Sequence, residues 1–149
     1  MDGRACKNKV LEQEMLLESI YNTIECGIIR YVKKENDTYE VLSMNQAALD
    51  MLDYESMQEC IDDGFGGVAS HVIEADKLKV ISMTKTLKHV GDMVKFEYQV
   101  KGKEGDDRWI LANSHLLKMD ENNYPMIQRT MTDITEKKLL ELQLRQERE

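Results

Sequence analysis

The sequence predicts an α+β domain in which a five-stranded antiparallel sheet carries short helices on one face and a flanking helix at each end of the chain. Three observations support this prediction. In the last third of the chain apolar and polar residues alternate, most regularly over residues 94–100, and a period of two is typical of a strand. Apolar residues near both ends recur instead at helical spacings. The length of 149 residues suits one domain with a substantial core.

An amphipathic helix is expected near the N-terminus, over residues 9–24. Val10, Leu17 and Ile24 recur every seven residues and place one apolar stripe along that helix. Such a stripe has to be buried, either against the same domain or against a second chain.

The remaining elements follow from hydrophobic periodicity and from turn-forming residues. Strands are expected over residues 26–33, 38–45, 94–100, 108–118 and 125–134, and helices over 45–52, 75–89 and 135–149. Asn45 is the expected N-cap of the first of these helices, and Gly91 stops the second. Residues 53–75 contain three glycines and are expected to be irregular, with Asp62 and Asp63 in a solvated turn.

Charge and composition limit the classes of function. Lys and Arg total 20 against 28 for Asp and Glu, and the formal net charge is -8, whereas binding to nucleic acid or to an anionic membrane surface needs a basic face. No apolar run approaches the roughly 20 residues that span a bilayer, and the first residues lack the apolar segment of a secretory signal. We therefore expect a cytoplasmic protein with no nucleic-acid partner and no membrane insertion in this segment.

Metal binding and catalysis are not expected either. Cys6, Cys26 and Cys60 are widely spaced and form no C-x-x-C pair, which favours reduced thiols and argues against a structural zinc site. Ser114 and His115 are adjacent in an expected strand, so their side chains point to opposite faces and cannot act as nucleophile and base. The sequence predicts no metal site, no catalytic residue and hence no enzyme.

Five segments, in order, resemble those of PAS sensory domains between about residues 16 and 136. They are Tyr21-Asn-Thr-Ile24 with Gly27-Ile28, Asn45-Gln-Ala-Ala48 with Leu52-Asp-Tyr54, Ile73-Glu-Ala-Asp76-Lys77, Lys103-Glu-Gly105 with Arg108-Trp109-Ile110, and Asp133-Ile-Thr-Glu136. The last matches the D-I-T-E motif that ends many PAS cores. Asp53 departs from the family pattern, in which glycine is common, and Ile73-Glu74 stand where many members have His-Pro.

The resemblance implies a PAS-like fold with three parts: an N-terminal tail and amphipathic helix (1–24), a PAS core (25–134) and the start of a C-terminal signalling helix (135–149). It implies a sensory module of a multidomain, bacterial-type signalling protein. The output domain of such a protein is a histidine kinase of a two-component system, a diguanylate cyclase or a transcription regulator.

The same resemblance implies how a signal leaves the domain. Asp133, Ile134 and Thr135 join the last strand to the exit helix and are the expected relay residues. The flanking helices are expected to hold a homodimer together. The alternative is a ligand-free PAS domain that serves as a dimerisation or interaction scaffold.

The cofactors of light-sensing and oxygen-sensing PAS domains are not expected here. Flavin-binding members resemble an N-C-R-F-L-Q helix with a reactive cysteine, which this sequence lacks. Haem-binding members use a histidine on the long helix, where Val80 stands nearest to that position, with His71 before the helix and His89 at its far end. An unknown small molecule remains as the ligand that an inner pocket would take.

Tyr98, Asn113, His115 and Arg129, together with Phe96, form the candidate ligand site. The expected position of the last turn places His115 opposite Arg129, and the resemblance places this face inside the fold. A guanidinium beside a histidine and an asparagine suits a small carboxylate. Two alternatives stay open: a register error of one residue turns this face outward, or Arg129 pairs with an internal carboxylate.

Overall fold

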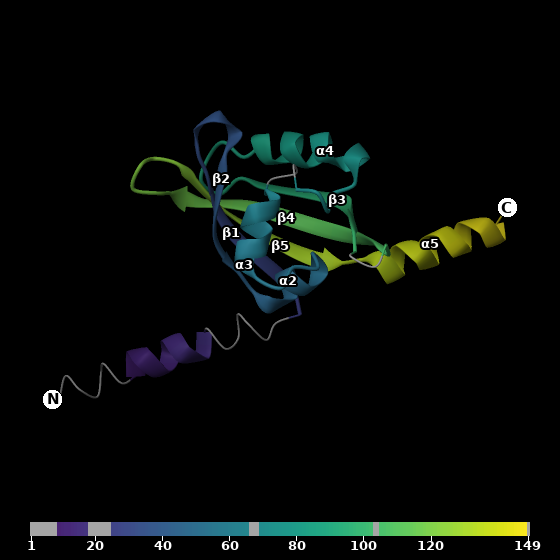
Figure 1. Ribbon diagram of the computed structural model, residues 1–149, viewed down its shortest axis with the longest axis horizontal. Helices are drawn as coiled ribbons and strands as arrows, with labels where there is room; N and C mark the ends of the chain where they lie inside the picture. The colour runs from purple at the N-terminus through teal and green to yellow at the C-terminus, as the bar shows by residue number, and fades with distance from the viewer. Residues whose placement is uncertain (1–8, 18–24, 66–68, 103–104, 149) are drawn as a thin grey trace.

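The computed structural model describes residues 9–17, 25–65, 69–102 and 105–148. They form a five-stranded antiparallel sheet in the order β2-β1-β5-β4-β3, with helices against one face (Figure 1). In chain order the elements are β1 (Gly27–Lys33), η1 (Glu35–Asp37), β2 (Tyr39–Met44), α2 (Gln46–Met51), α3 (Met57–Asp63), α4 (Glu74–Lys85), β3 (Met93–Lys101), β4 (Asp107–Met119), β5 (Pro125–Asp133) and α5 (Thr135–Arg148). The predicted fold class and sheet are confirmed.

The N-terminal helix is present over residues 9–17, and the rest of its expected length, 18–24, lies outside the described residues. Its large apolar side chains are exposed, namely Val10, Leu11, Met15, Leu16 and Leu17. Within the part of the chain that the structure describes, no helix is both long and apolar enough to cross a membrane.

Asn45 fixes the start of α2 to β1. Its Oδ1 atom accepts hydrogen bonds from Ala48 N at 3.0 Å and from Ile28 N at 2.8 Å. Its Nδ2 atom donates to Cys26 O at 2.8 Å. The first bond is the predicted N-cap, and the other two satisfy the buried amide and hold the helix against the sheet.

The expectation of an irregular segment over residues 53–75 is wrong, because this segment contains α3. Ser56 caps that helix by accepting a hydrogen bond from Glu59 N at 3.2 Å. A serine followed three residues later by a glutamate is a common start of a helix, so the sequence does carry the signal. The helix buries Cys60 and brings Asp63 to its C-terminal end.

α4 ends at Lys85 rather than near residue 89. The side chain of Asp92 accepts hydrogen bonds from Lys88 N at 3.0 Å and from His89 N at 2.9 Å. Because the Asp92 side chain satisfies the backbone amides of Lys88 and His89, these residues form a turn instead of continuing the helix.

The pairing of β4 with β5 decides which side chains face the helices. Next to the turn the ladder has the register that the sequence predicts, but it shifts at Leu117, which is a β-bulge. Beyond the bulge Ser114 pairs with Arg129. The expected pairing of His115 with Arg129 is wrong, because the bulge adds a residue that a regular ladder does not contain.

The free edge of β3 is covered by residues 71–73. Lys101 N donates a hydrogen bond to His71 O at 2.8 Å. Gln99 N donates to the Asp76 carboxylate, in the first turn of α4, at 2.7 Å. These bonds occupy backbone groups that an edge strand would otherwise expose, and they hold His71 beside the inner face of the sheet.

Candidate ligand site

Arg129 lies in the core and is only 2% exposed. Its Nε atom donates to Ser114 Oγ at 3.3 Å, and one Nη atom donates to Thr84 Oγ1 at 3.2 Å and to the Tyr31 hydroxyl at 3.5 Å. These acceptors are neutral hydroxyl groups. Among the described residues no carboxylate forms an ion pair with Arg129. The predicted inward position of Arg129 is confirmed. The alternative, in which Arg129 pairs with an internal carboxylate, is not found among the described residues.

Three aromatic rings surround this guanidinium. Arg129 Cζ lies 5.6 Å from the ring centroid of Tyr31, 5.5 Å from that of Phe65 and 5.5 Å from that of Phe96. The negative face of an aromatic ring attracts a cation. The rings therefore stabilise the charge without neutralising it.

The other predicted site residues divide between the two faces of the sheet. Phe96 and Tyr98 are buried on the inner face with Arg129. Burial raises the pKa of Tyr98, so its phenol stays protonated, and it donates to Met131 Sδ at 3.5 Å.

Asn113 and His115 do not belong to this site. Asn113 pairs with Thr130 and His115 with Gln128, on the face of the sheet opposite to Arg129. The Leu117 bulge causes this inversion, since a shift of one residue exchanges the two faces of a strand. Ser114, not His115, lies opposite Arg129 on the inner face.

The space beside Arg129 is small. It is a cavity of about 10 Å³, close to the volume that one water needs, and it is lined by Leu52, Phe65, Ala69, His71, Val72, Val80, Tyr98 and Arg129. The chain's own side chains fill the interior, so a ligand larger than water enters only if one of them moves.

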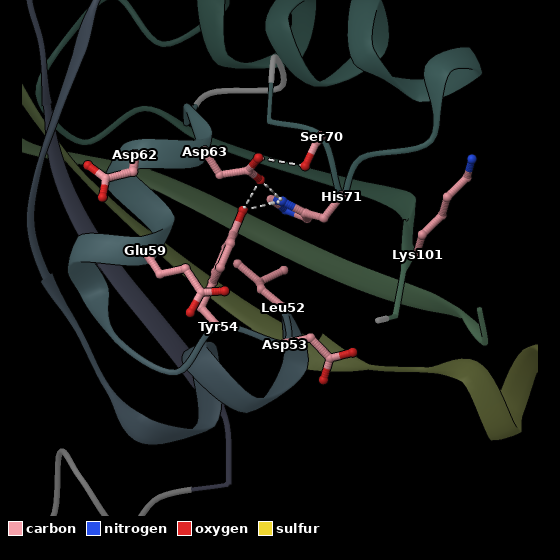
Figure 2. A pocket seen from close by; sticks show the side chains of 9 residues that line it. All are labelled: Leu52, Asp53, Tyr54, Glu59, Asp62, Asp63, Ser70, His71 and Lys101. Atoms are coloured by element: carbon pink, nitrogen blue, oxygen red, sulfur yellow. Dashed lines mark hydrogen bonds and ion pairs between the residues drawn. The ribbon is translucent and has the colours of Figure 1, made fainter. Parts of the chain in front are cut away.

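A larger pocket, of about 490 Å³, opens at the surface (Figure 2). Its lining residues are Leu52, Asp53, Tyr54, Glu59, Asp62, Asp63, Ser70, His71 and Lys101. Leu52 and His71 line both this pocket and the inner cavity. These two side chains therefore form the wall between them.

Four polar side chains converge at this wall (Figure 2). The hydroxyl of Tyr54 donates to Asp63 Oδ2 at 2.6 Å, and Ser70 Oγ donates to Asp63 Oδ1 at 2.5 Å. His71 Nδ1 lies 2.5 Å from the Tyr54 oxygen. Because Tyr54 gives its single proton to Asp63, we assign the proton of the last contact to His71 Nδ1.

The charges of this cluster follow from its surroundings. Burial lowers the pKa of His71 and outweighs Asp63, which raises it, while Arg129 lowers it further. Burial acts to raise the pKa of Asp63, but hydrogen bonds from Ser70 and Tyr54 outweigh it, and the pKa is lowered. At neutral pH an uncharged imidazole therefore separates a carboxylate from a buried guanidinium.

The turn expected at Asp62 and Asp63 is wrong, because both residues belong to α3. The expected exposure is correct for Asp62. That exposure is wrong for Asp63, whose side chain is 25% exposed and accepts two hydrogen bonds. Among the residues described, no group of three or more His, Cys, Asp and Glu side chains could hold a metal ion.

The junction between β5 and α5 is the second feature of interest. Thr135 N and Thr135 Oγ1 donate to Asp133 Oδ1 at 2.9 and 2.6 Å, so the side chain of Asp133 caps the start of the helix. The Thr135 hydroxyl also accepts a hydrogen bond from Trp109 N of β4 at 2.9 Å. Ile134 N donates to Trp109 O at 2.9 Å. The junction is thus tied to β4 as well as to β5.

One turn further along α5, Lys138 extends this attachment to β3. Its Nζ atom lies 2.6 Å from Glu97 Oε2 and 5.1 Å from the centroid of the Trp109 ring. Glu97 lies between Phe96 and Tyr98 in sequence, and a strand points alternate residues to opposite faces. The same short segment of β3 therefore contacts both the core around Arg129 and the exit helix.

No protein-family model and no curated protein matches the sequence. Solved structures do match. The PAS domain of an HTR-like protein from Haloarcula marismortui has a TM-score of 0.63 at 16% identity, covering 88% of this chain and 99% of that one. A PAS domain from Colwellia psychrerythraea also gives 0.63 at 16% identity, covering 85% and 98%. A sensory box histidine kinase/response regulator from Burkholderia thailandensis gives 0.59 at 20% identity, covering 89% and 94%.

Proposed function

We propose that this chain, which has the fold of a PAS domain, is a sensory module of a larger signalling protein. In this proposal a small carboxylate binds beside Arg129, and its binding changes how α5 leaves the sheet. Two chains of similar fold are a domain of a putative light and redox sensing histidine kinase from Haloarcula marismortui and a PAS domain from a two-component sensor histidine kinase, which supports a linked output domain. A homodimer and a cytoplasmic location belong to the same proposal.

The observation that carries the proposal is the buried guanidinium without a carboxylate. Burial of a charge is unfavourable unless an opposite charge and hydrogen bonds compensate for it. Arg129 has hydroxyl and aromatic neighbours but no anionic partner among the described residues. A carboxylate ligand supplies that partner in the planar, two-point geometry that suits a guanidinium.

The route from this site to the exit helix runs through β3. Phe96 contacts the guanidinium from the inner face, and Glu97 holds Lys138 of α5 from the outer face. A ligand that displaces the Phe96 ring also shifts the backbone that carries Glu97. The ligand then favours one of two positions of α5, which is a population shift between two arrangements.

The test is a thermal-shift panel of small carboxylates with and without further polar groups, such as propionate, succinate, benzoate and glycine, against chloride at equal ionic strength. We expect at least one of these carboxylates to raise the melting temperature of the unaltered protein. Arg129→Met should abolish that rise, whereas Arg30→Met, which removes an exposed guanidinium on the other face, should leave it intact. Stabilisation that persists undiminished in Arg129→Met would overturn the proposal.

The second candidate is the ligand-free interaction scaffold. The cavity of about 10 Å³ favours it, because a self-filled core of this kind needs no ligand to be complete. Native mass spectrometry of protein purified without added ligand separates the two. A bound small molecule supports the sensor, whereas a bare chain that no carboxylate stabilises supports the scaffold.

A further inference from the structure

Two unpaired charges of opposite sign lie on either side of the His71 side chain. Arg129 lines the inner cavity, and Asp63 lines the surface pocket. Leu52 and His71 line both spaces and form the wall between them. Within the described residues, His71 is the one basic group within ion-pair distance of Asp63, and burial keeps it neutral.

The surface pocket is acidic around this point. Four carboxylates line it, those of Asp53, Glu59, Asp62 and Asp63, against the single ammonium group of Lys101. Arg108 lies 3.3 Å from Asp53 and offsets that charge. Figure 2 shows that Lys101 extends away from the Asp63 carboxylate rather than towards it. The pocket therefore attracts a cationic group, whereas the inner cavity attracts an anionic one.

We propose that the ligand is a small zwitterion, an aminocarboxylate, whose carboxylate contacts Arg129 and whose ammonium group contacts Asp63. The inference rests on the proposed function, since it assumes a carboxylate beside Arg129. The ligand occupies the position of the His71 ring, which turns out of the wall between the two cavities. Its side chain is 10% exposed and contacts the surface pocket on one side, so outward rotation leads to open space.

This arrangement selects against simpler ligands. A plain carboxylate leaves Asp63 unpaired and approaches through an acidic pocket that repels it. A plain amine leaves Arg129 unpaired in the core. Only a molecule with both groups satisfies both charges, and the separation of its two groups has to match the distance across the wall.

The experiment compares three series of equal chain length on the unaltered protein by isothermal titration calorimetry. These are ω-aminocarboxylates from glycine to 5-aminopentanoate, the corresponding alkylcarboxylates, and the corresponding alkylamines. We expect one aminocarboxylate length to bind at least tenfold more tightly than its carboxylate and amine counterparts, since a tenfold difference is what one additional ion pair of modest strength provides.

Variants then assign the two ends of the ligand. Asp63→Asn should weaken the aminocarboxylate at least tenfold, whereas the plain carboxylate should bind no more weakly than before, because one repelling charge is removed. Asp50→Asn, which removes an exposed carboxylate outside the pocket that accepts a hydrogen bond from Gln46, should change neither by more than a small factor. Because the ligand series is measured on the unaltered protein, the test does not depend on whether a variant folds.

The possible failures are distinguishable. If carboxylates bind as tightly as aminocarboxylates and Arg129→Met removes both, the zwitterion is wrong and the proposed function stands. If none of the carboxyl-bearing compounds binds, both are wrong. If aminocarboxylates bind equally well to Asp63→Asn, the ammonium group lies elsewhere and the inference is overturned.

Discussion

Arg129 carries a permanent positive charge into an interior of largely apolar side chains. Hydroxyl groups and aromatic rings stabilise this charge, but the desolvation of a buried ion still costs several kcal/mol. We therefore expect the free protein to be no more stable than it would be with an apolar side chain of similar length at this position.

We expect Arg129→Met to leave the free energy of unfolding unchanged or to raise it by up to about 3 kcal/mol, because it removes the charge and keeps most of the volume. Arg129→Ala should lower it by about 3 kcal/mol, because it leaves a cavity. Urea unfolding of the three proteins measures both effects. An equal loss in both variants would show that the guanidinium hydrogen bonds stabilise the free core.

His71 makes stability depend on pH. Burial holds its pKa in the folded state below the ordinary 6.5, so the unfolded chain binds the proton more readily. The contribution of His71 is fully present above pH 6.5 and is lost as the pH falls from 6.5 towards the folded-state value. We therefore expect the free energy of unfolding to fall in this window, and to fall less in His71→Gln.

Urea unfolding above, at and below pH 6.5 measures this dependence. His89→Gln is the matched control, because His89 is exposed. Asp63 acts in a separate window: its pKa is lowered from 3.8, so its contribution is present above that value and is lost only at lower pH. A pH dependence that is the same in His71→Gln as in the unaltered protein would contradict the assignment.

At the scale of elements, the strands could be predicted, but the pairing of β4 with β5 could be predicted only up to the bulge. Hydrophobic periodicity and turn-forming residues predict all five strands to within one residue at each end. The Leu117 bulge has no comparable sign in the sequence, and it reverses the faces of Asn113 and His115. Because of this one residue, two of the four predicted polar site residues, Asn113 and His115, lie on the other face of the sheet from Arg129.

The polar cluster of Tyr54, Asp63, Ser70 and His71 could not be predicted from the sequence, for a different reason. Tyr54 follows α2, Asp63 ends α3 and His71 lies at the edge of β3, so only the tertiary fold brings them together. The Ser56 cap could have predicted α3. It would not have shown that Asp63 accepts a hydrogen bond from Tyr54, since no local pattern encodes a contact between separate elements.

The attachment of α5 to β3 should be measurable by hydrogen exchange. Lys138→Met removes the ion pair with Glu97 and the contact with the Trp109 ring. We expect the α5 amides to exchange roughly two- to fivefold faster, because an exposed ion pair contributes only modestly to stability, with no change in the strands. Lys137→Met, on an exposed position of the same helix, should have no such effect. Unchanged α5 exchange in Lys138→Met would remove β3 from the proposed relay.

At the scale of the whole molecule, the helices at the two ends keep apolar side chains in water. Leu139, Leu140, Leu142 and Leu144 of α5 are exposed, and Figure 1 shows this helix extending away from the sheet. A helix of this length is marginal in isolation. A second copy of the chain that covers the leucines would stabilise it.

We accordingly expect the protein to form a dimer that depends on these leucines. The double substitution Leu140→Ser and Leu144→Ser should shift it to a monomer in sedimentation velocity, because it removes the apolar side chains that the partner would cover. Gln143→Ser is the control on the same helix. A monomer at every accessible concentration of the unaltered protein would rule out this mode of association.

The bulge in β4 has an evolutionary consequence. Leu117 has no partner in the ladder, and the residues on either side of it pair with consecutive residues of β5. Loss of its codon would therefore merge the two registers into one continuous ladder, and the interior around Arg129 would keep the same lining. Homologous chains that differ by one residue inside this strand are thus expected to share one interior. Any alignment that permits gaps only in loops would misassign which of their side chains face the ligand.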